Sequence, residues 1–212
     1  MEQTGPTYFY ETEAIQNGAT YIAGVDEVGR GPFAGPVVAA AVRLDPDNIP
    51  EGMNDSKKLT HQKRLRISEE LHRVADVSIA QASVAEIDRL NILQASMLAM
   101  ERAVLGLSRN ADHVLVDGNR VPAGLRGRGV GLVKGDARSL SISAASIVAK
   151  IWRDQLMVDL AQQYPGYGWE RNAGYGTLEH RLALQNLGVT PHHRRSFKPV
   201  HNILYQEKNV SD

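Results

Sequence analysis

The sequence contains no cysteine, no long hydrophobic run and no net charge, and each absence narrows the range of possible functions. Without cysteine the chain has no disulfide, no thiolate nucleophile and no zinc or iron–sulfur site built on thiolates. Any metal ion must then be bound by oxygen or imidazole ligands. These exclusions leave the acidic side chains as the main source of chemistry, so we expect a carboxylate-based site.

The apolar runs are too short to cross a membrane. The longest are residues 36–42 and 143–149, well below the roughly 20 residues that a spanning helix needs. Residues 1–15 carry three glutamates and lack the basic start and apolar stretch of an export signal. We therefore expect a cytoplasmic protein without membrane contact, and the absence of a heptad pattern favours a monomer.

The zero net charge conceals an uneven distribution along the chain. Residues 1–106 carry 10 basic and 15 acidic side chains, whereas residues 107–212 carry 14 basic and 9 acidic ones. A basic half is typical of proteins that bind a polyanion such as nucleic acid. A solvated basic face would give the same counts, so the charge alone leaves both interpretations open.

Runs of β-branched and small apolar residues, bounded by glycine, proline or aspartate, predict five strands. They cover residues 21–27, 36–44, 77–83, 113–117 and 130–134. Helical periodicity and capping residues predict four helices over residues 60–75, 83–106, 140–164 and 177–187. This order of elements predicts an α/β or α+β fold in which residues from about 165 onward form a C-terminal appendage.

Four carboxylates lie at the ends of predicted strands, beside glycine: Asp26, Glu27, Asp117 and Asp136. Several carboxylates at one place repel one another unless a divalent cation neutralises them, and Mg²⁺ prefers such oxygen ligands. Strand-terminal aspartates also often cap turns, which is the alternative for each position taken singly. Because neighbours on a regular strand point to opposite faces, Asp26 and Glu27 share a site only if the strand bends or ends there.

The acidic pair is followed directly by Gly29-Arg30-Gly31. Two glycines let the backbone approach a ligand and offer unshielded amides, and the arginine between them can reach a phosphate. Ordinary turns contain the same three-residue pattern. Its position after Asp26 and Glu27 is what favours a binding role.

A longer block around these residues, 24–41, closely resembles the signature of the bacterial ribonuclease HII family. Further blocks resemble that family in the same order, at residues 54–59, 116–118, 134–136, 143–150, 153–154, 174–177 and 192–197. The resemblance extends over about residues 21–200. Agreement of so many separated blocks is more specific than any one motif.

The resemblance implies a ribonuclease H-like fold, a mixed five-stranded sheet flanked by helices with a C-terminal helical part. It divides the chain into an N-terminal extension (1–20), a catalytic domain (21–164) and a C-terminal part that completes the substrate site (165–212). The family cleaves the RNA strand of RNA–DNA hybrids and cuts duplex DNA 5′ to single ribonucleotides, leaving a 3′-hydroxyl and a 5′-phosphate. Asp26, Glu27, Asp117 and Asp136 match its catalytic residues, which bind two Mg²⁺ or Mn²⁺ ions.

The resemblance also implies how substrate is recognised. Gly29, Arg30, Gly31 and Tyr175 match the residues that detect the 2′-hydroxyl, although a packing role for the tyrosine is the simpler reading of the sequence alone. The expected phosphate contacts are Lys57 and, with less support, Lys58, Lys150, Arg194 and Arg195. Lys150 can equally extend its stem along the core. Ala173 departs from the lysine that many members carry, which puts one phosphate contact in doubt.

Other functions fit the sequence less well. A non-catalytic nucleic-acid-binding module would gain nothing from carboxylates facing phosphates. The related type III enzyme usually has an extra N-terminal domain, and only about 20 residues precede the first predicted strand. Nothing points to a polynucleotide transferase or resolvase of the same fold, and the pair His192-His193 lacks further ligands at zinc spacing. No required protein partner is evident.

Overall fold

The structure of the protein is a computed structural model that describes residues 5–206. These residues form two compact units, each assembled from segments that are distant in sequence. Unit 1 comprises residues 5–28, 38–81 and 96–151 of the described chain, and unit 2 comprises residues 29–37, 82–95 and 152–206. Because the units interleave along the chain, the proposed division into 21–164 and 165–212 stays a prediction.

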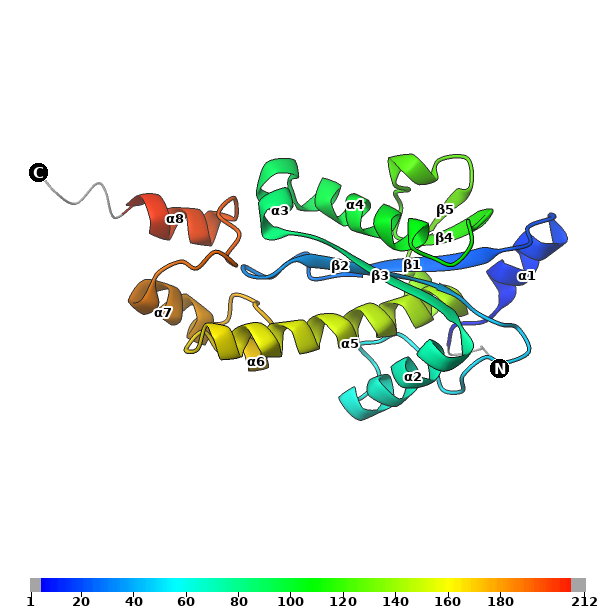
Figure 1. The fold of residues 1–212 in the computed structure, drawn as a ribbon, viewed down its shortest axis with the longest axis horizontal. Helices are drawn as coiled ribbons and strands as arrows, with labels where there is room; N and C mark the ends of the chain where they lie inside the picture. Colours follow the sequence, from blue (N-terminus) through cyan, green and yellow to red (C-terminus); the bar gives the residue numbers. More distant parts are fainter. Residues whose placement is uncertain (1–4, 207–212) are drawn as a thin grey trace, which may run out of the picture. The chain divides into compact units, whose positions relative to one another are not determined.

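A mixed five-stranded sheet forms the centre of unit 1, as predicted (Figure 1). Its strands are β1 (Ile22–Val28), β2 (Val37–Arg43), β3 (Asp76–Ala82), β4 (His113–Asp117) and β5 (Gly129–Leu132). The spatial order is β3-β2-β1-β4-β5, with β2 antiparallel to β1 and with β4 parallel to both β1 and β5. The parallel pairing of β1 with β4 brings the carboxyl ends of two strands together, which is where sites form in such sheets.

Helices cover both faces of this sheet in Figure 1, with α2 (His61–Val74) and the first half of α5 (Leu140–Gln163) on one face and α4 (Ile92–Leu105) on the other. One core cluster joins Ala40 and Val42 of β2 to Leu71 of α2 and Ala145 of α5. The small side chains of β2 and α5 allow the helix to lie close to the sheet. Burial of this apolar area is the main stabilising term of the unit.

Unit 2 is mostly helical. It contains α3 (Val84–Leu90), the second half of α5, α6 (Trp169–Asn172), α7 (Leu178–Leu187) and α8 (Lys198–Gln206). Met157, Trp169, Leu184 and Val200 lie in its buried cluster. The Thr177 hydroxyl accepts a hydrogen bond from the His180 amide and so caps α7, as the sequence predicts.

Four helical features differ from the prediction. The single helix predicted over residues 83–106 is wrong, because Asn91 adopts φ 71 and separates α3 from α4. Helix α1 (Phe9–Gln16) and the helices α6 and α8 were not predicted. Helix α1 is short and has no side-chain N-cap, and its anchor is the distant contact of Glu11 with the Ser139 hydroxyl and the Ser141 amide.

The two remaining short helical segments are η1 (Ala123–Leu125) and η2 (Gly135–Ala137). Over residues 5–206, no helix is both long and apolar enough to span a membrane.

Candidate active site

Two predicted carboxylates lie side by side at the carboxyl ends of β1 and β4. Val25 of β1 pairs with Val116 of β4 in parallel register, and the next residue on each strand is an aspartate. Asp26 is only 7% exposed, and Asp117 is half-buried. Parallel pairing of two apolar strands therefore delivers two acidic side chains to one edge of the sheet.

Asp136 reaches the same edge through the turn that follows β5. The Gly118 amide donates to the Leu132 carbonyl at 3.0 Å, and the Gly135 amide donates to Asp117 Oδ1 at 2.7 Å. Lys134 makes this turn with a left-handed φ of 55. A Cβ on Gly135 would lie 3.2 Å from Asp117 Oδ1, so glycine lets the turn carrying Asp136 approach Asp117 closely.

Electrostatic repulsion is evident within this group. Burial raises the pKa of Asp26 well above its ordinary value, and the charges of Glu27 and Asp117 raise it further. Burial also raises the pKa of Asp136, followed by the charges of Asp117 and Asp55. The charges of Glu27 and Asp117 therefore act on Asp26, and the charge of Asp117 acts on Asp136.

Glu27 follows Asp26 within β1, and its amide donates to Asp26 Oδ1 at 2.7 Å. Strand β1 continues to Val28, so the two side chains leave a regular strand in opposite directions. Glu27 contributes negative charge at Asp26, and its role as a ligand stays a prediction.

The donor set suits a hard divalent cation. Every predicted ligand is a carboxylate oxygen, and a cation would relieve the repulsion that raises the pKa of Asp26 and Asp136. Over residues 5–206, no group of three or more acidic or histidine side chains is arranged to hold a metal ion. The binding of ions by these four carboxylates therefore stays a prediction.

A network of hydroxyls beneath Asp26 was missed from the sequence. The Ser146 hydroxyl of α5 hydrogen-bonds Asp26 and lies 3.0 Å from the Ser56 hydroxyl. The Arg64 guanidinium donates to the Ser56 and Leu59 carbonyls at 2.8 and 2.6 Å. These contacts fasten the 54–59 loop beside the acidic group. The loop also supplies Asp55, an acidic residue that the motif at 54–59 contains and that the sequence reasoning did not single out.

The predicted lysines of unit 1 occupy suitable positions for phosphate contacts. Lys57 and Lys58 are exposed on the 54–59 loop, and the charge of Lys57 lowers the pKa of Asp136. Lys150 lies on α5 one turn after Ser146 and is partly exposed. Their contacts with phosphate stay predictions.

In unit 2 the structure brings Gly31 and Tyr175 together. A Cβ on Gly31 would lie 3.4 Å from Cε1 of the Tyr175 ring, and that ring is 46% exposed. Arg30 and Gly31 are both exposed. A tyrosine buried in the core would not leave nearly half of its surface in solvent, so the arrangement favours the recognition role predicted for Tyr175.

Arg194 corrects one prediction. It is 0% exposed, and its guanidinium donates to backbone carbonyls of the loop 29–36 rather than facing solvent. The prediction of a phosphate contact at Arg194 is therefore wrong, because its donors are buried and engaged. Arg195 is exposed, and its amide donates to Asp88 at 3.1 Å, so its phosphate contact stays a prediction.

The histidines of unit 2 form a buried relay rather than a metal site. The Thr190 amide donates to His193 Nδ1 at 3.0 Å, so the proton of His193 is on Nε2, which lies 3.0 Å from His180 Nε2. That His180 nitrogen also accepts from Trp169 Nε1 at 3.1 Å, and His180 Nδ1 then donates to the Tyr175 carbonyl at 3.0 Å. Both rings must be neutral for every bond to form.

This relay predicts a loss of stability in mild acid. Burial, followed by the charges of His180 and His192, lowers the pKa of His193 to about 3. The unfolded chain takes up this proton near pH 6.5, so between the two values the unfolded state binds more protons and stability falls as pH falls. The expected contribution of His193 approaches about 1.4 kcal/mol per pH unit. Urea unfolding at several pH values between 7.5 and 4.5 measures it.

The raised pKa values of Asp26 and Asp136 make the folded state more stable as pH falls, which opposes the effect of His193. The contribution of His193 is therefore measured by comparing the pH profile of a variant with that of the parent. His193→Gln should flatten the decline relative to the parent. His61→Gln removes an exposed histidine of α2 and should keep the parent's profile. Identical pH profiles for His193→Gln and the parent would contradict the neutral relay.

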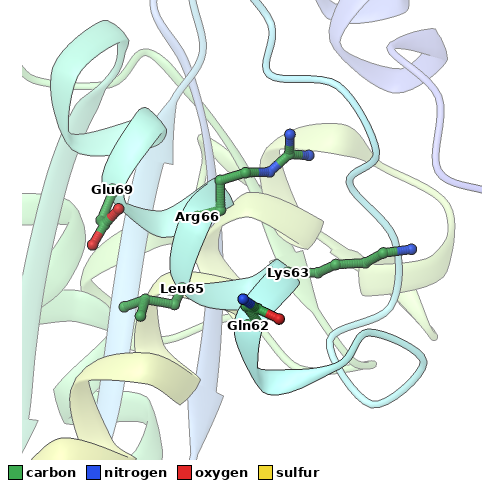
Figure 2. Close-up of a pocket in the computed structure, with 5 residues that line it drawn as sticks. All are labelled: Gln62, Lys63, Leu65, Arg66 and Glu69. Atoms are coloured by element: carbon green, nitrogen blue, oxygen red, sulfur yellow. The ribbon is translucent and has the colours of Figure 1, made fainter.

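A surface hollow of about 440 Å³ lies elsewhere in unit 1. Figure 2 shows its five lining side chains, all from α2: Gln62, Lys63, Leu65, Arg66 and Glu69. None of the predicted site residues lines it. The hollow is therefore separate from the acidic residues at the ends of β1 and β4.

Comparisons with known proteins agree with this arrangement. The family model described as ribonuclease HII matches residues 23–200. The ribonuclease HII of Cereibacter sphaeroides is 65% identical over 211 residues, covering 100% of both chains. That of Ruegeria pomeroyi is 69% identical over 204 residues, covering 96% of this chain and 87% of the relative.

A solved structure shows the same fold. The ribonuclease H2 of Pyrococcus horikoshii superposes with a TM-score of 0.75 at 28% identity, covering 90% of this chain and 100% of that one. Sequence, fold and acidic strand ends lead to one conclusion. The chain belongs to the ribonuclease HII family and is an endoribonuclease of the ribonuclease H type.

Proposed function

We propose that this endoribonuclease hydrolyses the RNA strand of RNA–DNA hybrids and cuts duplex DNA on the 5′ side of single ribonucleotides. The products would carry a 3′-hydroxyl and a 5′-phosphate, as in the removal of ribonucleotides from DNA. The enzyme would act as a monomer with two Mg²⁺ or Mn²⁺ ions held by Asp26, Glu27, Asp117 and Asp136.

The observation that carries the proposal is the position of Asp26 and Asp117, each one residue beyond the paired Val25 and Val116 of two parallel strands, where the charge of Asp117 raises the pKa of Asp26. Such an arrangement does not stabilise the fold, since buried like charges are costly. It is useful where positive charge arrives with the substrate complex. The divalent ions would activate the attacking water and neutralise charge on the phosphate.

The protein's own side chains have separable roles in this proposal. Ser146 and the Glu27 amide hold the Asp26 carboxylate in place, and the Gly135 amide does the same for Asp117. Lys57 offers an exposed ammonium beside Asp136, suited to a phosphate of the duplex. Phosphate contacts of this kind position the duplex without reading its sequence.

Recognition of the 2′-hydroxyl is assigned to Gly29, Arg30, Gly31 and Tyr175. The 2′-hydroxyl is the group that distinguishes RNA from DNA, and backbone amides can bind it without a side chain. The Tyr175 ring beside Gly31 offers a face for stacking on the adjacent sugar or base.

The test is cleavage of a labelled DNA duplex that contains one ribonucleotide, with all-DNA duplex and RNA–DNA hybrid as controls. We expect a single cut 5′ to the ribonucleotide with Mg²⁺ or Mn²⁺, cutting of the hybrid, and no cutting of all-DNA. Removing the metal with EDTA should abolish both activities, because the water then keeps its ordinary pKa.

The outcomes separate the parts of the proposal. Cutting of the hybrid alone would leave the metal site standing and remove the recognition role of Gly29–Gly31 and Tyr175. Undiminished cutting in EDTA would remove the metal-dependent mechanism. No cutting of any substrate would favour a nucleic-acid-binding module.

A further inference from the structure

A fully buried arginine organises the loop of residues 29–36 in unit 2. Arg194 donates through Nε to the Gly35 carbonyl and through Nη1 to the Arg30 carbonyl, both at 2.9 Å. Its Nη2 donates to the Gly29 and Pro36 carbonyls at 2.5 and 3.2 Å. The Arg194 amide also donates to the Phe33 carbonyl at 2.8 Å. One residue therefore binds five carbonyls of a short segment.

A second buried arginine links this loop to the segment that carries Tyr175. Arg153 is 1% exposed and donates to the Ala34 and Pro36 carbonyls, both at 3.2 Å, and to the Ala173 carbonyl at 3.0 Å. The Phe33 amide donates to the Gly174 carbonyl at 2.8 Å. The 29–36 loop and residues 173–175 thus form one bonded assembly.

The contact with Arg153 also explains why residue 29 is a glycine. Gly29 has φ 92, and a Cβ at this position would lie 2.1 Å from Arg153 Nε. A larger residue would be strained in its backbone and would displace the guanidinium.

The direction of these carbonyls fixes the direction of the neighbouring amides. In a planar trans peptide the C=O and the following N–H point in opposite directions. Since the Gly29 and Arg30 carbonyls point at Arg194, the Arg30 and Gly31 amides point away from it. Both residues are exposed and Gly31 lies beside the Tyr175 ring, so the two successive amides lie on the side of the loop that faces away from Arg194. Such paired amides bind anions and hydroxyls.

We infer that Arg194, assisted by Arg153, is a positioning residue for ribonucleotide recognition. Arg194 turns the Gly29 and Arg30 carbonyls inward and thereby aims the Arg30 and Gly31 amides at the 2′-hydroxyl or the adjoining phosphate. Arg153 sets the distance of this donor pair from Tyr175. The inference rests on the proposed function.

Holding the two arginines together is unfavourable in itself. Burial, followed by the charge of Arg153, lowers the pKa of Arg194 to about 9. Apolar side chains of similar volume would avoid that cost, but they would leave the carbonyls of the loop without donors. A rigid fork of donors is needed where several carbonyls must keep one orientation.

The test compares rates on two DNA duplexes that differ at one nucleotide, which is either a ribonucleotide or its 2′-fluoro analogue. The ratio of the two rates measures recognition of the 2′-hydroxyl. Arg194→Lys keeps the positive charge but loses the planar guanidinium that donates to several carbonyls at once. The ratio should therefore fall at least about tenfold, in line with the sensitivity of positioned groups to small displacements. Arg153→Lys should lower the ratio as well, with KM changing more than kcat.

The matched control is Leu160→Ala, which removes buried apolar contacts from the same unit. It should lower stability in urea and leave the ratio at the parent's value, with rates compared where circular dichroism shows each variant folded. Unchanged ratios in the arginine variants, with stability lost as in Leu160→Ala, would overturn the inference. If Arg194→Lys does not fold, Arg153→Lys decides. A parent enzyme with no preference for the ribonucleotide would refute the proposed function itself.

Discussion

Replacing Asp117 by asparagine should reduce cleavage at least about 10³-fold, the scale on which one electrostatic group in a catalytic site acts. Asparagine keeps the shape of the side chain and an oxygen that can accept from the Gly135 amide, now 2.7 Å from Oδ1. The turn that carries Asp136 should therefore persist. What is lost is one negative charge from the acidic group at the ends of β1 and β4, and with it the affinity for a divalent cation.

Binding should behave differently from cleavage. Removing a carboxylate that faces phosphates does not weaken duplex binding, so anisotropy with a labelled hybrid in EDTA should give a Kd within about threefold of the parent's, shifted if anything to tighter binding. Glu69→Gln, which removes an exposed charge from α2, controls for charge alone and should keep full activity. Activity of Asp117→Asn within tenfold of the parent would remove Asp117 from the catalytic group.

The sheet and the acidic residues could be predicted because local features determine them. Most of the strands are short runs of mainly apolar residues, β3 alternates apolar and polar residues, and β1 and β2 lie on either side of a glycine-rich turn. Asp26 and Asp117 could be placed at strand ends without knowing which strands are neighbours. The parallel pairing of Val25 with Val116, which brings them together, depends on contacts that no local pattern encodes.

Other features escaped prediction because they arise from contacts between distant residues. In the sequence Ser146 is one of several small residues in a helical segment, and nothing marks it as a site residue. Only the packing of α5 on the sheet brings its hydroxyl to Asp26. Glu11 stabilises α1 through Ser139 and Ser141, about 130 positions later in the chain. The break at Asn91 follows from a positive φ in a segment whose apolar spacing is otherwise continuous.

Arg194 shows most clearly what could not be predicted from the sequence. In sequence it belongs to a basic pair, and a basic pair in a nucleic-acid enzyme suggests phosphate contacts. In the structure Arg194 is buried against carbonyls while Arg195 is exposed. Two adjacent arginines therefore have opposite surroundings, which depends on the path of the 29–36 loop and not on their own neighbours.

Gly24→Ala should destabilise the protein by at least about 3 kcal/mol, at the upper end of overpacking effects. Gly24 lies in β1, two residues before Asp26, and is buried beneath the start of α5. A Cβ there would lie 2.2 Å from the Ser141 carbonyl carbon and 2.4 Å from the Ile142 amide nitrogen. Both are backbone atoms, so no rotation of a side chain can relieve the overlap.

The backbone of α5 also cannot easily retreat. The Ser141 amide is bound to Glu11 at 2.9 Å, and the Ile142 amide is bound to the Ser139 hydroxyl at 3.2 Å. Accommodating the methyl group must break these bonds or move β1, and either change displaces Ser146 from Asp26. Urea unfolding should show the lower stability, and residual activity should fall even where the variant is folded.

Gly5→Ala, where an added Cβ meets nothing closer than 4.0 Å, is the matched control and should stay within about 0.5 kcal/mol of the parent. Equal stability of Gly24→Ala and Gly5→Ala would show that close contact between β1 and α5 is not what holds the acidic edge in place.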